Sequence, residues 1–181
     1  MNLPNLITLA RLLSVPLTIW LLLENRFEAA FWTFVLAGVS DAIDGFIARR
    51  FDSRTRLGAL LDPIADKSLL VGVYVTLGGA GHLPVWLVIL VVFRDLMIVG
   101  GFLLVQAMAQ GMRSEPLIVS KLNTAFQIGL AALTLAKLGL RLDPGVIFDV
   151  LIWCVAATTL LSGAAYLIRW ARALAGMEQI S

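Results

Sequence analysis

The feature that most constrains this chain is a succession of long apolar segments separated by short polar stretches. Hydrophobic residues make up 60% of the 181 residues, whereas charged residues make up only 14%. A soluble domain carries about 25% charged residues, and a helix needs about 20 mainly apolar residues to cross a bilayer. The composition and its arrangement therefore predict an all-α integral membrane protein.

Six apolar segments follow one another, and prolines, glycines and charged residues separate them. The expected transmembrane helices are Pro4–Leu23, Glu28–Arg50, Leu57–Leu77, Pro84–Gln110, Leu117–Leu138 and Val146–Leu174. Neither an internal repeat nor a low-complexity stretch divides the chain. We therefore expect residues 1–181 to form a single membrane domain of six spans.

Positive charge is distributed unequally between the two ends of these segments. The linker between the second and third expected helices holds or borders Arg49, Arg50, Arg54 and Arg56, whereas Gly78 to Pro84 has no Lys or Arg. Cytoplasmic loops of membrane proteins carry an excess of Lys and Arg. The pattern predicts that this linker and both termini are cytoplasmic, and that the protein lies in the inner (cytoplasmic) membrane of the cell.

Four aspartates lie in the second and third expected helices, close to the linker that joins them. Asp41 and Asp44 are three residues apart, and Asp62 and Asp66 are four apart, so each pair shares one helix face. The short linker should make the two helices antiparallel neighbours. Because ionisable residues inside a membrane are costly and mark functional sites, we expect the four carboxylates to converge on one cavity in the cytoplasmic half of the membrane.

Four carboxylates in one cavity repel one another unless protons or cations neutralise them. No His or Cys stands beside them, and a purely oxygen ligand set favours hard cations such as Mg²⁺, Mn²⁺ or Ca²⁺. Two divalent ions would balance four negative charges, and a two-metal site stabilises in-line displacement at phosphorus. Ordinary helix packing with paired carboxylates is the weaker alternative, because four acids in one hairpin are too costly for packing alone.

The aspartates belong to a longer pattern that resembles the signature of the CDP-alcohol phosphotransferase family, D-x2-D-G-x2-A-R-x8-G-x3-D-x3-D. The residues that match it, without a departure in spacing, are Asp41, Asp44, Gly45, Ala48, Arg49, Gly58, Asp62 and Asp66. The resemblance implies a six-helix core that transfers a substituted phosphate from a CDP-alcohol to a hydroxyl acceptor, with release of CMP. It also implies that the four aspartates hold two divalent cations, Mg²⁺ or Mn²⁺, and that Asp66 is the general base.

The same resemblance implies where the nucleotide lies. The residues expected to border the CDP moiety are Gly45, Ala48, Arg49 and Gly58. The start of the chain is similar to the family's Pro-Asn-x-x-Thr-x-x-Arg entry to the first helix, so Asn5 and Thr8 would line the nucleotide end of the cavity beside Arg11. The alternative for this stretch is interfacial anchoring, because the long side chain of Arg11 can reach the headgroups.

Polar residues of the fourth and fifth expected helices are candidates for acceptor binding. Arg94 lies near the middle of its helix and needs a partner, which we expect to be a substrate phosphate or a motif carboxylate, with an interhelical ion pair as the alternative. Its neighbour Asp95 should point elsewhere on the helix. Ser120 and Lys121 begin a polar stripe, and Lys121 could either hold the acceptor's phosphate or extend to the interface. Lys67 is expected to pair with a neighbour or lie at the interface.

A membrane phosphatidyltransferase that uses CDP-diacylglycerol accounts for all of these residues. The runs Arg94–Met97 and Ser120–Ala125 resemble the CMP-forming cardiolipin synthases of the family, which implies phosphatidylglycerol as the acceptor. Phosphatidylglycerophosphate synthases, which use glycerol 3-phosphate, share most of the pattern and are the alternative. A divalent-cation transporter is more remote, because it would not explain Arg49 and the glycines at these spacings. The resemblance also implies a homodimer, and no nucleic acid partner is expected.

Overall fold

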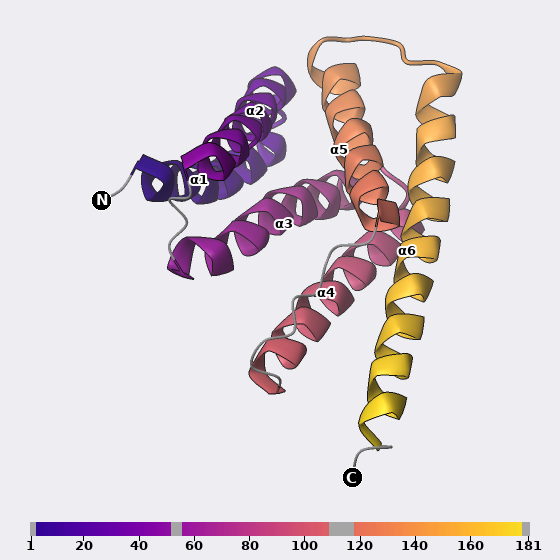
Figure 1. Cartoon of the computed structure of the whole chain (residues 1–181). Helices are drawn as coiled ribbons and strands as arrows, with labels where there is room; N and C mark the ends of the chain where they lie inside the picture. Colours follow the sequence, from indigo (N-terminus) through magenta and orange to yellow (C-terminus); the bar gives the residue numbers. More distant parts are fainter. Residues whose placement is uncertain (1–2, 52–55, 109–117, 179–181) are drawn as a thin grey trace.

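The computed structural model describes residues 3–51, 56–108 and 118–178, with side chains over 12–40, 67–101 and 118–169. Over these ranges the chain forms six α-helices and no strand (Figure 1). They are α1 (Leu3–Leu23), α2 (Phe27–Phe51), α3 (Arg56–Gly79), α4 (Val85–Met108), α5 (Ile118–Gly139) and α6 (Val146–Glu178). The prediction of an all-helical chain is confirmed, and the helices begin and end close to the expected residues.

Two helices are long and apolar enough on their described residues to cross a membrane, Ile118–Gly139 and Val146–Arg169. Shorter apolar segments come from α1, α2 and α3. Large apolar side chains such as Leu23, Phe93 and Trp153 are each 67% exposed, as expected where lipid covers the surface. The helices are therefore consistent with a membrane protein, while six spans and cytoplasmic termini stay predictions.

The helices pack against one another in a small number of pairs. α5 packs along α6, and α6 also contacts α4, while α1 contacts both α2 and α3. Figure 1 shows α5 and α6 side by side, with α3 and α4 crossing beside them. Between these helices lies a core of fully buried side chains that includes Tyr74, Leu87, Leu130 and Leu135. Burial of these large apolar side chains stabilises the packing of α3, α4 and α5 in a region that contains none of the four aspartates.

The helices α2 and α3 share neighbours instead of packing directly on each other in the part of the chain that the structure describes. α1 and α5 each contact both of them. The direct antiparallel packing expected from the short linker is therefore not seen in these residues. The ends of α2 and α3 nearest the linker carry the four aspartates, whose side chains lie outside the described residues.

Left-handed residues end two of the helices and turn the chain back. Asn25 (φ 57°) follows α1, and the N–H of Arg26 donates to the carbonyl oxygen of Leu21 at 2.8 Å. Gly81 (φ 77°) follows α3, and the N–H of His82 donates to the carbonyl oxygen of Leu77, five residues back, at 2.8 Å. This arrangement is the Schellman motif, which needs a residue that tolerates positive φ. Both turns are short and let consecutive helices return through the bundle.

Gly139 gives the first testable prediction, because α5 ends against the start of α2. A Cβ atom added at Gly139 would lie 2.7 Å from the Cα and from the backbone N of Glu28. Since backbone atoms cannot move aside cheaply, Gly139→Ala should destabilise the protein by about 1–3 kcal/mol. The measurement is thermal unfolding of the purified protein in detergent.

Gly129 provides the matched control for this prediction. It lies on the same helix, and an added Cβ would meet nothing within 4 Å. Gly129→Ala should therefore leave the unfolding temperature unchanged or raise it, because alanine favours helix over glycine. Equal unfolding temperatures for the two variants would contradict the close approach of α5 and α2.

Candidate functional site

The backbone places the four predicted metal ligands on the two expected helices. Asp41 and Asp44 lie on α2, and Asp62 and Asp66 lie on α3. The side chains of all four aspartates lie outside the described residues, and their convergence on metal ions stays a prediction.

For the predicted nucleotide-binding residues, too, the structure describes the backbone and not the side chains. Their backbone lies on α1, α2 and α3, and their side chains lie outside the described residues: Asn5, Thr8, Gly45, Ala48, Arg49 and Gly58. The helical spacing on which the family signature depends is therefore present in the fold. The contacts of these residues with CDP stay a prediction.

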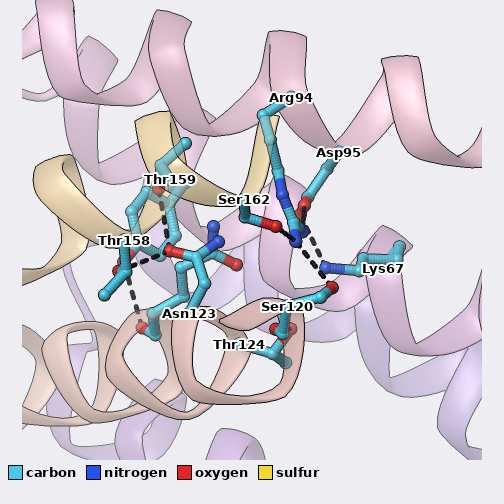
Figure 2. Close-up of polar contacts among 11 residues, drawn as sticks. Lys67, Arg94, Asp95, Ser120, Asn123, Thr124, Thr158, Thr159 and Ser162 are labelled. Atoms are coloured by element: carbon cyan, nitrogen blue, oxygen red, sulfur yellow. Dashed lines mark hydrogen bonds and ion pairs between the residues drawn. The ribbon is translucent and has the colours of Figure 1, made fainter. Parts of the chain in front are cut away.

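Directly after Asp66 the described side chains form a buried polar cluster of Lys67, Arg94, Asp95, Ser120 and Ser162 (Figure 2). Asp95 accepts at both carboxylate oxygens, from Lys67 Nζ at 2.9 Å and from Arg94 Nη1 at 2.7 Å. Arg94 Nη2 donates to Ser120 Oγ at 2.6 Å and also to Ser162 Oγ. The polar cluster thereby joins α3, α4, α5 and α6.

The polar cluster is buried unevenly. The side chains of Arg94 and Asp95 are 3% and 2% exposed, whereas that of Lys67 is 24% exposed. Buried ions require close partners, because desolvation costs several kcal/mol per ion. Two cations share one carboxylate here, so the polar cluster carries one net positive charge.

The ion pairs correct one expectation and confirm another. Asp95 was expected to point away from Arg94, and this is wrong, because the long arginine side chain curls back to the carboxylate of the next residue. In the apolar interior this contact satisfies both charges at once. The expectation that Lys67 pairs with a neighbour is confirmed by its contact with Asp95.

Of the three predicted acceptor-binding residues, the structure brings two together. Arg94 and Ser120 are hydrogen-bonded to each other, whereas Lys121 is exposed and forms no ion pair with another described residue. Among the described groups, Arg94 Nε has no hydrogen-bond partner. Binding of the acceptor by these residues stays a prediction.

A second polar contact between α5 and α6 was missed in the sequence. Asn123 is fully buried, and its Oδ1 accepts hydrogen bonds from Thr158 Oγ1 at 2.8 Å and Thr159 Oγ1 at 2.9 Å. The polar stripe on α5 was recognisable at helical spacing. The matching signal on α6 was the series Thr158, Thr159 and Ser162, whose small polar residues sit in an otherwise apolar run.

A cavity of about 180 Å³ opens between α3 and α4 beside the polar cluster. Its lining residues are Lys67, Ser68, Val71, Asp95, Leu96 and Val99. A larger cavity of about 540 Å³ lies at the opposite end of α2 from the aspartates, around Arg26, Glu28 and Arg141. Of these two cavities, the smaller adjoins a residue implicated in chemistry, since Lys67 follows Asp66 directly.

The family model and the similar proteins that match this chain all indicate the same family. The sequence model of CDP-alcohol phosphatidyltransferases matches residues 1–161. The chain is 36% identical, over 94% of its length, to the chloroplastic CDP-diacylglycerol–glycerol-3-phosphate 3-phosphatidyltransferase 1 of Oryza sativa subsp. japonica. It is 33% identical, over 91% of its length, to the CMP-forming cardiolipin synthase of Rattus norvegicus.

Coverage differs between these relatives. The chain spans 57% of the rice protein and 60% of the rat protein. It also matches the CDP-diacylglycerol–glycerol-3-phosphate 3-phosphatidyltransferase of Bacillus subtilis, at 30% identity over 91% of the chain and 93% of the relative. The shared region is thus nearly the whole of one relative and little more than half of the other two.

Proposed function

This chain belongs to the CDP-alcohol phosphatidyltransferase family, and we propose that it transfers a phosphatidyl group from CDP-diacylglycerol to a hydroxyl acceptor with release of CMP. The observation that carries the proposal is the complete eight-residue signature, Asp41 to Asp66, distributed over α2 and α3. The family is membrane-bound, which agrees with the apolar helices.

In the proposed reaction, the acceptor's hydroxyl oxygen forms a bond to the phosphorus of the phosphatidyl group. The bond from that phosphorus to the oxygen of CMP breaks, and CMP leaves. Asp66 takes the proton of the acceptor hydroxyl as general base. Gly45, Ala48 and Gly58 leave room for the CDP moiety because they carry small or no side chains, and Arg49 supplies positive charge beside it.

Two divalent cations, Mg²⁺ or Mn²⁺, would be held by Asp41, Asp44, Asp62 and Asp66. The donor set fits them, because four carboxylates offer only hard oxygen ligands and together carry the charge of two such ions. When bound, the cations supply charge stabilisation at the diphosphate and at the leaving phosphate.

For the acceptor, we propose phosphatidylglycerol, so that the product is cardiolipin. The support is the similarity of Arg94–Met97 and Ser120–Ala125 to CMP-forming cardiolipin synthases. The alternative is glycerol 3-phosphate, which appears in the names of the rice and Bacillus relatives. The names of the relatives include both kinds of enzyme, which an acceptor panel distinguishes.

We further propose six membrane spans with both termini and the α2–α3 linker in the cytoplasm. The arginines of that linker support this orientation. The active site then opens to the cytoplasmic side of the inner membrane, where both a lipid and a soluble headgroup can reach it. The family resemblance supports a homodimer, and no nucleic acid takes part.

An acceptor panel tests the proposed function. Purified protein receives CDP-diacylglycerol, a divalent cation, and either phosphatidylglycerol or glycerol 3-phosphate, and CMP and the lipid product are identified by mass. We expect cardiolipin from phosphatidylglycerol. Rapid use of glycerol 3-phosphate with none of phosphatidylglycerol would establish the alternative. The absence of CMP release with either acceptor would contradict transferase activity and favour the alternative of a divalent-cation transporter.

Lys121 gives a second testable prediction on acceptor use. Lys121→Ala should raise the KM for the acceptor by about tenfold, since a charged hydrogen bond contributes about 1.5–3 kcal/mol and 1.4 kcal/mol is tenfold in an equilibrium. The KM for CDP-diacylglycerol should stay the same, because α5 carries none of the signature residues. Initial rates against each substrate provide the measurement, and an unchanged acceptor KM would exclude Lys121 from the site.

A further inference from the structure

We propose that the cavity between α3 and α4 binds the phosphate of a lipid acceptor, with the ammonium group of Lys67 as its ligand. This inference rests on the proposed transferase function and gives the acceptor a route to Asp66. Lys67, Asp95 and Leu96 are among the six residues that line the cavity. The occupant is the phosphodiester of phosphatidylglycerol, entering from the surrounding lipid.

Charge is the first argument. The polar cluster contains two cations, Lys67 and Arg94, but one carboxylate, Asp95. One positive charge in this buried setting is uncompensated within the described residues, and an uncompensated charge in a low-dielectric interior is costly. A phosphodiester carries one negative charge and would balance it. Lys67 is the accessible member of the pair, at 24% exposure against 3% for Arg94.

The shape of the cavity is the second argument. Beyond its charged end the cavity is lined by Val71, Leu96 and Val99, and Leu96 is 64% exposed at the surface of α4. Such a surface faces the lipid if α4 spans the membrane. A headgroup phosphate at Lys67 would leave its acyl chains beside these apolar side chains. Glycerol 3-phosphate has no apolar part to bury there, so the cavity favours a lipid acceptor.

Position is the third argument. Lys67 follows Asp66, the proposed general base, and consecutive Cα atoms lie about 3.8 Å apart. In phosphatidylglycerol a single glycerol unit separates the phosphate from the attacking hydroxyl. A phosphate held by Lys67 would therefore keep that hydroxyl near the middle of α3, where residue 66 lies. Among the lysines and arginines whose side chains the structure describes, only Lys67 adjoins a residue of the signature.

Arg94 and Asp95 act as positioning residues in this arrangement. Asp95 accepts from Lys67 Nζ at 2.9 Å, while Arg94 holds the other oxygen of the same carboxylate at 2.7 Å. Ser120 and Ser162 in turn fix the guanidinium group of Arg94 (Figure 2). The lysine is thus oriented from α4, α5 and α6, although it is carried by α3.

The test combines a binding readout with kinetics. Photoactivatable phosphatidylglycerol is crosslinked to the purified protein in nanodiscs without CDP-diacylglycerol, and the labelled peptides of α3 and α4 are quantified. Kinetic constants for phosphatidylglycerol and CDP-diacylglycerol are measured in parallel. Lys67→Gln removes the charge, Lys67→Arg keeps it, and Val71→Phe fills the cavity without changing charge.

Lys67→Gln should lower crosslinking at α3 and α4 several-fold and raise the KM for phosphatidylglycerol about tenfold, with the KM for CDP-diacylglycerol unchanged. Lys67→Arg should restore most of the crosslinking and most of the affinity for phosphatidylglycerol. Val71→Phe should lower crosslinking and raise the KM in the same way, and it tests the site independently if Lys67→Gln does not fold. Lys137→Gln is the matched control, because Lys137 is exposed at the far end of α5 and lies over the Phe148 ring.

Three results separate the possible failures. Equal labelling by photoactivatable diacylglycerol, which has no phosphate, would show general lipid contact and overturn the site. Wild-type transfer to phosphatidylglycerol that neither Lys67→Gln nor Val71→Phe alters would also overturn it, while the proposed function stands. Lys67-dependent labelling by phosphatidylglycerol without any transfer would uphold the site and contradict the proposed function.

Discussion

Excess chelator is expected to lower the rate of CMP release by roughly 10³-fold or more. Bound cations supply several kcal/mol of charge stabilisation at phosphorus, and each 1.36 kcal/mol changes a rate tenfold. Without them, Asp41, Asp44, Asp62 and Asp66 would leave the diphosphate facing uncompensated negative charge. The measurement is CMP release by purified protein before and after treatment with EDTA.

Restoration experiments provide the control for this prediction. Adding back Mg²⁺ or Mn²⁺ should recover the rate, because the carboxylate oxygens suit hard cations. Zn²⁺ should recover it less well, since its preferred His and Cys ligands do not accompany the aspartates in the sequence. Full transferase activity in excess chelator would rule out the metal site.

Asp66→Asn is expected to reduce kcat by about 10²–10⁴-fold, which is the usual contribution of a general base. Binding of CDP-diacylglycerol should persist, because the other three aspartates still bind the metal ions. Asp41→Asn should differ from it by also weakening nucleotide and metal binding. Initial rates and the binding of CDP-diacylglycerol, measured on both variants, test this division of roles.

Asp149 provides the control for the Asp66 variant. It is exposed in the first turn of α6, and Asp149→Asn makes the same chemical change there. That variant should keep the wild-type rate. An Asp66→Asn enzyme that also turned over near the wild-type rate would refute the assignment of the base.

The sequence predicted the helices well because their limits depend on local chemistry. Runs of apolar residues define the segments, and Asn25 and Gly81 end α1 and α3 through positive φ. The positions of Asp41 to Asp66 on α2 and α3 followed from the same reading, since the motif spacing is itself helical. These features need no knowledge of which helices are neighbours.

The contacts between helices could not be predicted in the same way. Register gives the direction of a Cα–Cβ bond, but the end of an arginine side chain can reach around the helix, as Arg94 does toward Asp95. Thr158 and Ser162 are ordinary residues in an apolar helix until α5 and α4 are known to lie against it. The pairing of Lys67 was anticipated, but its partner was identifiable only from the packing of α3 on α4.

The ion pair inside α4 has a consequence for how the protein is made. Arg94 and Asp95 lie far from either end of α4, and each charged residue at a helix centre costs about 2.5–3.5 kcal/mol on insertion into a bilayer. The contact between Arg94 and Asp95 offsets part of that cost within α4, and hydrogen bonds of the guanidinium group to Ser120 of α5 and Ser162 of α6 offset a further part. If α4 spans the membrane as proposed, it gains these two partners only after α5 and α6, which follow it in the sequence, have been synthesised. A nascent chain arrested before α5 would lack the hydrogen bonds from Arg94 to Ser120 and Ser162, so α4 would be less stable there than in the complete bundle.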